Sequence, residues 1–212
     1  YQVYDGYSNS NVATVYINVI SQNDAPVAVI DNYSVNEDVT KSVSSQGVLA
    51  NDYDYDLDAL TAEVVSDASH GTLNLNPNGS FTFKPDTNYY GSDSFTYKVW
   101  DGFTYSNTAT VYITVISVND WPVANQDQYN AFEDVTLNVP SDSGVLANDT
   151  DVEGSTLTAV LVTGINSNEG NLTFNPDGSF DYIPASNFNG TVTFTYQAFD
   201  GTGYSFSGTV MI

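Results

Sequence analysis

Residues 101–124 read DGFTYSNTATVYITVISVNDWPVA. Within this stretch, residues 108–116 alternate polar and apolar side chains and are rich in Thr, Val, Ile and Tyr, which predicts a β-strand with one buried face. Asn119, Asp120 and Pro122 follow the strand. Proline has no N–H and biases the preceding residue toward extended backbone, so we expect the chain to leave the strand without turning back. The stretch therefore joins a strand to an acidic, proline-stiffened linker.

The same passage occurs earlier in the chain, at residues 5–28, as DGYSNSNVATVYINVISQNDAPVA. A partial third copy begins at Asp200 and ends at Ile212. A period of about 100 residues fits an array of whole domains, because solenoid repeats are much shorter. We expect residues 1–22 to be the C-terminal hairpin of a preceding repeat, residues 23–118 to be one repeat, and residues 119–212 to be a second repeat whose last strand is truncated.

Each repeat shows the pattern of a β-sandwich. Strand-like segments, about seven per repeat, are separated by turn signals every 8 to 12 residues or so, and no amphipathic helix is evident. The turn Asn76-Pro77-Asn78-Gly79 recurs as Asn175-Pro176-Asp177-Gly178. Alternating aromatic residues in residues 95–99 and 194–199 are expected to fill the core. The predicted fold is all-β, with tandem immunoglobulin-like β-sandwiches in a linear array.

The composition is strongly acidic. The chain has 26 Asp and Glu residues against three Lys and Arg residues, which gives a net charge of −23. This balance argues against binding to nucleic acid or to an anionic membrane. A hydrophobic fraction of 41% is too high for a disordered acidic chain, and the absence of cysteine excludes disulfides. If the protein is extracellular, metal ions are the expected substitute for disulfides.

Acidic residues alternate in two corresponding segments: Asp52, Asp54, Asp56 and Asp58 in the first repeat, and Asp149, Asp151 and Glu153 in the second. In an extended segment alternate side chains share a face, so these carboxylates repel one another. Ca²⁺ relieves such crowding because it prefers about 6 to 8 oxygen ligands. A solvated charged loop is the alternative interpretation. The spacing does not match an EF-hand, since the required glycine and distal glutamate are absent.

A second acidic pair, Glu37 and Asp38, follows the first predicted strand and recurs as Glu133 and Asp134. The recurrence favours a ligand for a cation, with an exposed turn as the alternative.

Together these motifs resemble bacterial cadherin-like repeats, the immunoglobulin-like modules that occur in tandem in giant secreted adhesins. The resemblance rests on VNDxPVA at the linker, ED after the first strand, GVLANDxD, NPxGSF and GxxxFxYxxxDG, in the same order twice. It covers essentially the whole chain. It implies a secreted or cell-surface protein with Ca²⁺ bound between successive repeats.

By position, the resemblance implies two sets of calcium ligands. The set for the central junction is Glu37, Asp38, Asn119, Asp120, Asp149, Asp151 and Asp200. The set for the junction that precedes the first full repeat is Asn23, Asp24, Asp52, Asp54 and Asp101. The number of ions per junction stays open, since no Asp-Arg-Glu run like that of animal cadherins is present.

The expected function is a non-catalytic, calcium-stiffened extender of a large adhesin or surface filament. The alternative is a carbohydrate-binding module that uses exposed aromatic side chains from the set Trp100, Trp121, Tyr53, Tyr55 and Tyr105. We do not expect an enzyme, because the acids belong to repeated linkers and the chain has no cysteine, no arginine and one histidine. The expected partners are neighbouring repeats of the same chain, with cell-surface or matrix polysaccharide and other copies in a strand-exchanged filament as further candidates.

Overall fold

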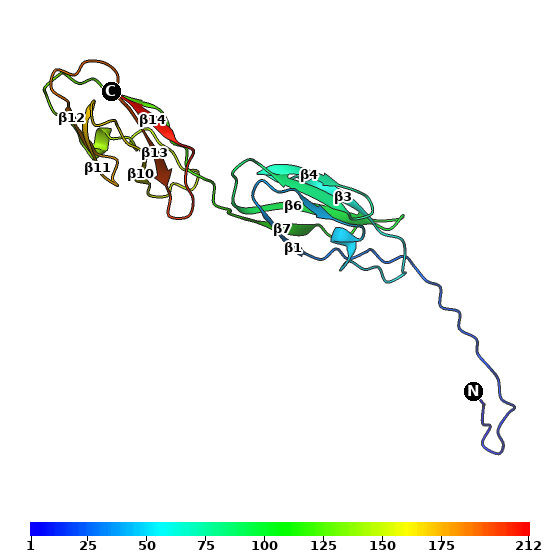
Figure 1. The fold of residues 1–212 in the computed structure, drawn as a ribbon. Coiled ribbons are helices and arrows are strands. Elements are labelled where there is room, and N and C mark those ends of the chain that lie inside the picture. Colours follow the sequence, from blue (N-terminus) through cyan, green and yellow to red (C-terminus); the bar gives the residue numbers. More distant parts are fainter. The chain divides into compact units, whose positions relative to one another are not determined.

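The computed structural model describes residues 1–212 and divides into two compact units, unit 1 (Tyr1–Ile116) and unit 2 (Ser117–Ile212) (Figure 1). Each unit has seven strands, β1–β7 in unit 1 and β8–β14 in unit 2, and one short 3₁₀-helix. None of the helices is long and apolar enough to span a membrane.

Unit 1 is a sandwich of two sheets. The larger sheet has the order β1 (Asp31–Asn36), β7 (Ala109–Ile116), β6 (Gly91–Trp100) and β3 (Thr61–Ser66). The smaller sheet has the order β2 (Lys41–Val43), β5 (Phe81–Pro85) and β4 (Gly71–Leu75), and the 3₁₀-helix η1 (Gly47–Leu49) follows β2. Strand β1 runs parallel to β7 over six register positions, from Asp31 opposite Val111 to Asn36 opposite Ile116. The first and last strands of the unit therefore end side by side.

The core of unit 1 lies where the predicted alternation placed it. In β6, Phe95, Tyr97 and Val99 are completely buried, while the residues between them are only partly covered. Phe81 from the smaller sheet meets Phe95 edge-on, with ring centroids 5.6 Å apart. Such aromatic pairs add about 0.5–1.5 kcal/mol beyond the burial of their area.

Unit 2 repeats this architecture. Its larger sheet has the order β10 (Thr158–Thr163), β13 (Thr193–Phe199), β14 (Gly208–Met211) and β8 (Asp127–Gln128). Its smaller sheet has the order β11 (Gly170–Phe174), β12 (Phe180–Pro184) and β9 (Leu137–Val139), with the 3₁₀-helix η2 (Ser141–Ser143) after β9. The first strand is shorter than expected, because β8 pairs with β14 at only two positions. The prediction of tandem immunoglobulin-like sandwiches is confirmed.

A glycine turn positions the acidic loop of each unit. In unit 1, Gly79 has a φ of +80° in the turn between β4 and β5, and its carbonyl accepts a hydrogen bond of 3.0 Å from Val48 N in η1. A Cβ on Gly47 would lie 2.0 Å from the same carbonyl oxygen, so only glycine fits there. Unit 2 repeats the bond from Val145 N to Gly178 O at 3.0 Å. The turn thus fixes the start of the loop that carries the alternating acids.

Residues 1–22 lie outside the sandwich of unit 1. A single antiparallel bridge joins Tyr4 to Asn9, and this segment has no named strand. Val15, Ile17 and Val19 are exposed by 63%, 83% and 86%, although the residues at the same places in β7 are buried. The sequence of a core strand is present here without a sheet against which it packs.

Candidate metal centre

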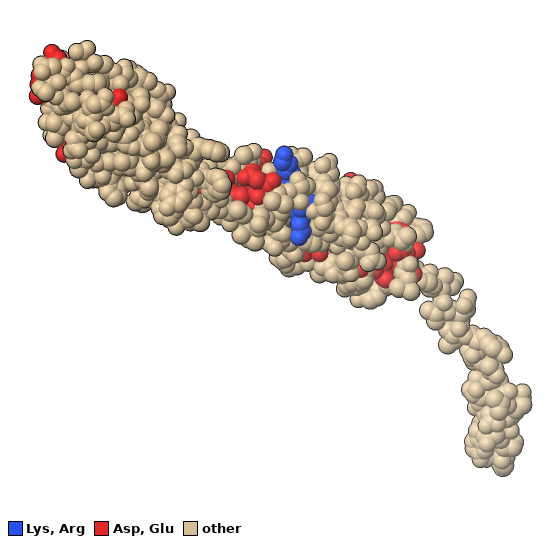
Figure 2. Space-filling model, in the orientation of Figure 1, with Lys and Arg blue, Asp and Glu red and all other residues tan.

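The densest acidic group of unit 1 lies on the loop after η1. Carboxylate oxygens of Asp54, Asp56 and Asp58 lie within 4.8 Å of one another. In Figure 2, acidic side chains gather at the end of the unit 1 sandwich from which the N-terminal segment leaves. Asp54 is only 7% exposed, and its Oδ1 accepts hydrogen bonds from Asp56 N (2.8 Å) and Asp58 N (3.3 Å). Its Oδ2 is buried and has no hydrogen-bond partner. A buried carboxylate oxygen without a donor is costly unless a bound cation or water satisfies it.

Two residues before β1 join this group. Asn23 Nδ2 donates to Asp101 Oδ2 at 3.1 Å, and Asp24 N donates to Asp56 Oδ2 at 2.7 Å. The second carboxylate oxygen of Asp101 accepts from two backbone N–H groups of the turn after β6, at 2.6 and 2.7 Å. Thus the structure brings four predicted ligands, Asn23, Asp24, Asp54 and Asp101, to one end of unit 1.

The electrostatics of this end are unfavourable without a cation. Desolvation, followed by the charges of Asp54, Asp101 and Asp56, raises the pKa of Asp58. No lysine compensates for these charges, because the one lysine that forms an ion pair, Lys98, pairs with Glu63 at 3.4 Å. Like charges held this close destabilise the loop unless a positive ion lies between them.

Unit 2 reproduces the arrangement at its own N-terminal end. Asn119 Nδ2 donates to Asp200 Oδ2 at 2.9 Å, and Asp120 N donates to Glu153 Oε1 at 3.2 Å. Asp151 Oδ1 accepts from Ser155 N at 2.8 Å, while Asp151 Oδ2 and Glu153 Oε2 have no hydrogen-bond partner. A cavity of about 450 Å³ opens beside Asp151 and Ser155.

The carboxylate of Asp200 stays ionised in this setting. The side-chain amide of Asn119, with the backbone N–H groups of Gly203 and Thr202, lowers its pKa. A carboxylate that keeps its charge in this way is well suited to bind a cation.

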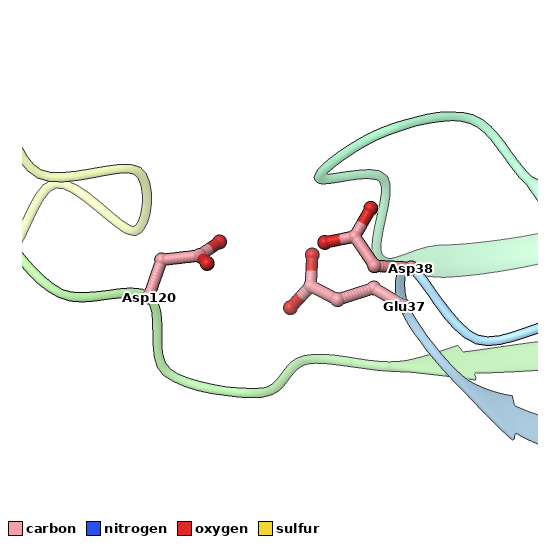
Figure 3. A group of neighbouring side chains, drawn as sticks. All are labelled: Glu37, Asp38 and Asp120. Carbon is pink, nitrogen blue, oxygen red and sulfur yellow. The ribbon is translucent and has the colours of Figure 1, made fainter.

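Glu37 and Asp38 lie at the opposite end of unit 1, on the turn after β1. Figure 3 draws them together with Asp120, which lies on the segment that follows β7. Oxygens of Glu37 and Asp38 lie within 4.8 Å of each other. Asp38 Oδ1 accepts from Asn88 N at 3.1 Å, and Asp134 in unit 2 forms the same bond with Asn187 N at 2.9 Å. The recurrence shows that Asp38 closes a turn, which leaves Glu37 as the better candidate ligand of the pair.

The structure places two other predicted ligands, Asp52 and Asp149, in a different environment. Asp52 Oδ1 accepts from Val29 N at 2.7 Å, and both of its carboxylate oxygens lie 3.0 Å from the hydroxyl of Tyr97. Asp149 has the same contact with Tyr196 at 3.0 Å. These hydrogen bonds assign Asp52 and Asp149 to a buried polar network rather than to the group around Asp54.

Asp31 and Asp127 complete these networks and were not singled out from the sequence. The Tyr97 hydroxyl lies 3.2 Å from Asp31 Oδ2, and the Tyr196 hydroxyl lies 3.3 Å from Asp127 Oδ2. Desolvation raises the pKa of each of these aspartates to about 6. Their presence at the same place in both repeats was the available signal.

The ligand sets predicted from the sequence also omitted Asp56, Asp58 and Glu153. Their alternate spacing with Asp54 and Asp151 was the available signal. In unit 1, the loop after η1 brings the carboxylates of Asp54, Asp56 and Asp58 together.

Two seven-stranded sandwiches, with the same acidic group at corresponding ends, define a tandem protein of the cadherin-like class. The family model of the bacterial cadherin-like domain matches residues 23–117 and 119–212. The chain belongs to the bacterial cadherin-like domain family.

Solved structures of cadherins share the fold. Human CDH23 EC21-23 is 18% identical with a TM-score of 0.61, and the match covers 89% of this chain and 68% of that chain. Human Protocadherin-24 EC1-2 is 16% identical with a TM-score of 0.58, over 90% of this chain and 97% of that one. Human Mucin-like Protocadherin EC1-2 is 15% identical with a TM-score of 0.55, over 88% and 96%. Among curated protein sequences, none is similar enough to count as a relative.

Proposed function

We propose that the two units are non-catalytic extender repeats of a large extracellular adhesin or surface filament, stiffened by Ca²⁺ bound at the linkers. The observation that carries this proposal is the recurrence of one set of oxygen donors at the N-terminal end of both units. In both sets, carboxylate oxygens of Asp54, Asp151 and Glu153 have no hydrogen-bond donor.

The chemistry of the donors favours Ca²⁺ over other metals. All of the side chains in both groups offer oxygen, from carboxylates and from the amides of Asn23 and Asn119. Zinc and copper sites draw on histidine or cysteine, and neither residue type is part of these groups. Mg²⁺ retains several waters and demands near-octahedral geometry, whereas Ca²⁺ accepts about 6 to 8 oxygens in flexible arrangements.

The remaining predicted ligand is Glu37, which lies at the end of unit 1 where the linker begins. Glu37 N donates to Ile116 O at 2.9 Å, so Glu37 lies beside the last residue of β7. Asp120 follows Ile116 by four residues, a tether of at most about 14 Å when fully extended. Asn119 and Asp120 are hydrogen-bonded to Asp200 and Glu153 in unit 2, as described above. The proposed calcium ligands of unit 2 are therefore Asp120, Asp151, Glu153 and Asp200, with Asn119 as an added oxygen donor, and Glu37 is proposed as a further ligand from the connectivity of the chain alone.

Calcium in such a centre has a mechanical role. In its absence the converging carboxylates repel, and the linker of residues 117–120 is free to hinge. When Ca²⁺ is bound, ligands from both units restrain the linker, and repeated units become a stiff extracellular spacer. Binding only to the folded form also raises stability, by about 2.7 kcal/mol when the free ion is at 100 times its Kd.

Small-angle X-ray scattering and calorimetry on the 212-residue chain test the proposal. In millimolar calcium we expect a larger maximum dimension and a higher melting temperature than in chelator. Isothermal titration with CaCl₂ supplies the number of ions bound. Identical scattering profiles and melting curves in the two conditions would exclude the proposed role.

A matched variant separates calcium binding from general charge effects. Asp151→Asn removes a carboxylate of the centre, and Asp142→Asn removes an exposed carboxylate from η2. Both substitutions reduce the negative charge equally. Because only Asp151 belongs to the proposed centre, only Asp151→Asn is expected to reduce the response to calcium. Equal effects of the two substitutions would point to non-specific screening.

Carbohydrate binding is the second candidate function. It is favoured by an aromatic cavity of unit 2 that is distinct from the acidic groups, and it does not depend on the calcium proposal.

A further inference from the structure

Unit 2 has an aromatic cavity between its linker and the turn after β13. The cavity has a volume of about 440 Å³, which lies within the range of about 300–1,000 Å³ common for small-molecule sites. It is lined by Trp121, Gln197, Thr202, Tyr204 and Phe206, among others. Trp121 is 65% exposed and Phe206 is 87% exposed. Two large aromatic side chains that line the cavity are therefore open to solvent.

The corresponding place in unit 1 is filled by charged side chains. Lys98 Nζ lies 3.7 Å from the ring centroid of Tyr105 and 3.4 Å from Glu63 Oε1, and the Tyr105 hydroxyl donates to Glu63 Oε2 at 2.8 Å. Unit 2 has Gln197 in place of Lys98 and Val160 in place of Glu63. The tyrosine is retained as Tyr204, but the ion pair that covers its counterpart is absent.

Trp121 replaces Ala25 of the first linker, and a second residue changes with it. A Cβ on Gly203 would lie 2.7 Å from Cδ1 of Trp121, so the indole needs glycine at that position. Unit 1 has Thr104 at this place and the small Ala25 at the linker position of Trp121. The two differences are coupled by packing, which shows that the indole is seated on the turn rather than free in solvent.

Phe206 is the third difference. Its counterpart in unit 1, Asn107, ties the turn to the linker: Asn107 Nδ2 donates to Ala28 O at 2.9 Å, and Ala28 N donates to Asn107 Oδ1 at 3.1 Å. Phenylalanine cannot form these bonds. Unit 2 thus has an exposed aromatic ring where unit 1 has a structural amide, at the edge of the same cavity.

We propose that this cavity binds a neutral carbohydrate. The face of an aromatic ring carries a negative quadrupole and attracts the polarised C–H groups of a sugar ring. Tyr204 is held in place by stacking on Phe199, with centroids 4.5 Å apart, and Gln197 is fixed by a 2.7 Å bond from its Nε2 to Ser205 O. The Gln197 side-chain oxygen and the hydroxyls of Thr202 and Tyr204 are the polar groups available to sugar hydroxyls.

Charge decides between neutral and anionic sugars. No Asp, Glu, Lys, Arg or His lines the cavity, and the chain as a whole carries a charge of −23. A sulfated or uronic-acid polymer would be repelled and would find no cation to pair with. A neutral glycan meets neither obstacle.

Affinity electrophoresis of the full chain in calcium buffer tests the proposal, with laminarin, dextran, xylan or galactomannan in the gel and dextran sulfate as the charged control. We expect retardation by at least one of the neutral polymers and none by dextran sulfate. The variants Trp121→Ala and Phe206→Asn each introduce the residue that unit 1 has at the same place, so both are compatible with the fold. Each should weaken binding by at least about tenfold, as expected for an aromatic anchor.

Three electrophoresis results would overturn the proposal: no retardation by any of the four neutral polymers, equal retardation of the wild type and both variants, or retardation by dextran sulfate alone. Ala25→Gly, at the place of Trp121 in the other linker, is the matched control and should bind like the wild type. Self-association of the chain that is lost with Trp121→Ala, without any sugar binding, would assign the cavity to a second copy and also overturn the proposal. Calcium titration of Trp121→Ala shows separately whether the metal centre is intact.

Discussion

The backbone N–H of Glu37 donates to the carbonyl of Ile116 at 2.9 Å, so the residue after the first strand is fastened to the end of the last strand. This contact follows from the parallel pairing of β1 with β7. It places the carboxylate of Glu37 beside Ile116, where the chain leaves unit 1. Ile116 precedes the acidic linker residue Asp120 by four residues.

Glu37→Gln tests whether Glu37 is a calcium ligand. It retains the backbone bond to Ile116 and removes one anionic ligand. We expect calcium affinity in isothermal titration to fall by at least about tenfold, since a calcium site depends on the number of its charged ligands. Asp142→Asn, which is equal in charge change, should leave the affinity unaltered, and a similar loss in both variants would remove Glu37 from the ligand set.

Asp54→Asn tests the buried carboxylate oxygen that has no partner. In chelator, the variant should be as stable as the wild type or more so, because one of several crowded negative charges is gone. In calcium, its thermal stabilisation should be smaller than that of the wild type. Differential scanning calorimetry in both conditions measures this, and an unchanged calcium-induced shift would show that Asp54 is not a ligand.

The stability of the apo protein should depend on Asp31 and Asp127 between about pH 4 and pH 6. Desolvation raises the pKa of both from 3.8 to about 6, so the folded protein holds their protons in a range where the unfolded chain has released them. Stability from these groups is therefore highest at the acidic end and decreases as the pH rises through this window. Urea unfolding in chelator measures the slope. In Asp31→Asn/Asp127→Asn, the decrease should be smaller than in the wild type, whereas an equal decrease would assign it to other acids.

Tyr97→Phe should destabilise unit 1 by about 1–3 kcal/mol, because it removes a hydroxyl donor from a cluster of buried oxygen acceptors. The hydroxyl lies within 3.2 Å of oxygens of Asp31 and Asp52 and 2.9 Å from the carbonyl of Val48. Tyr112→Phe on the exposed face of β7 is the matched control and should change stability by less than about 0.5 kcal/mol. Urea unfolding of unit 1 resolves the difference, and equal values for the two variants would show that the network is not stabilising.

The strands could be predicted because alternation is a local signal. Residues 108–116 form β7 almost to the residue, and the buried positions of β6 match the alternating aromatics. The two-residue length of β8 could not be predicted, since it depends on how many register positions β14 offers.

The candidate site was predictable only in part. Asn119 and Asp200 were matched by motif, and the structure joins them through a hydrogen bond. Asp52 has the same spacing from Asp54 as Asp54 has from Asp56, so the pattern grouped all three. No local feature of the sequence predicts that the hydroxyl of Tyr97, 45 residues away, forms a hydrogen bond with the Asp52 carboxylate. Long-range contacts of this kind separate structural acids from candidate ligands.

The turn that contains Asp101 and Asp200 forms a third time at Asp5, where no sandwich surrounds it. Asp5 Oδ1 accepts from Tyr7 N and Ser8 N at 2.8 Å each, as Asp101 does with its own turn. A loop closed by bonds over two and three residues needs no distant contact, and such closures occur early and fast during folding. The orientation of this aspartate is therefore set by its own turn and does not require the surrounding sheets.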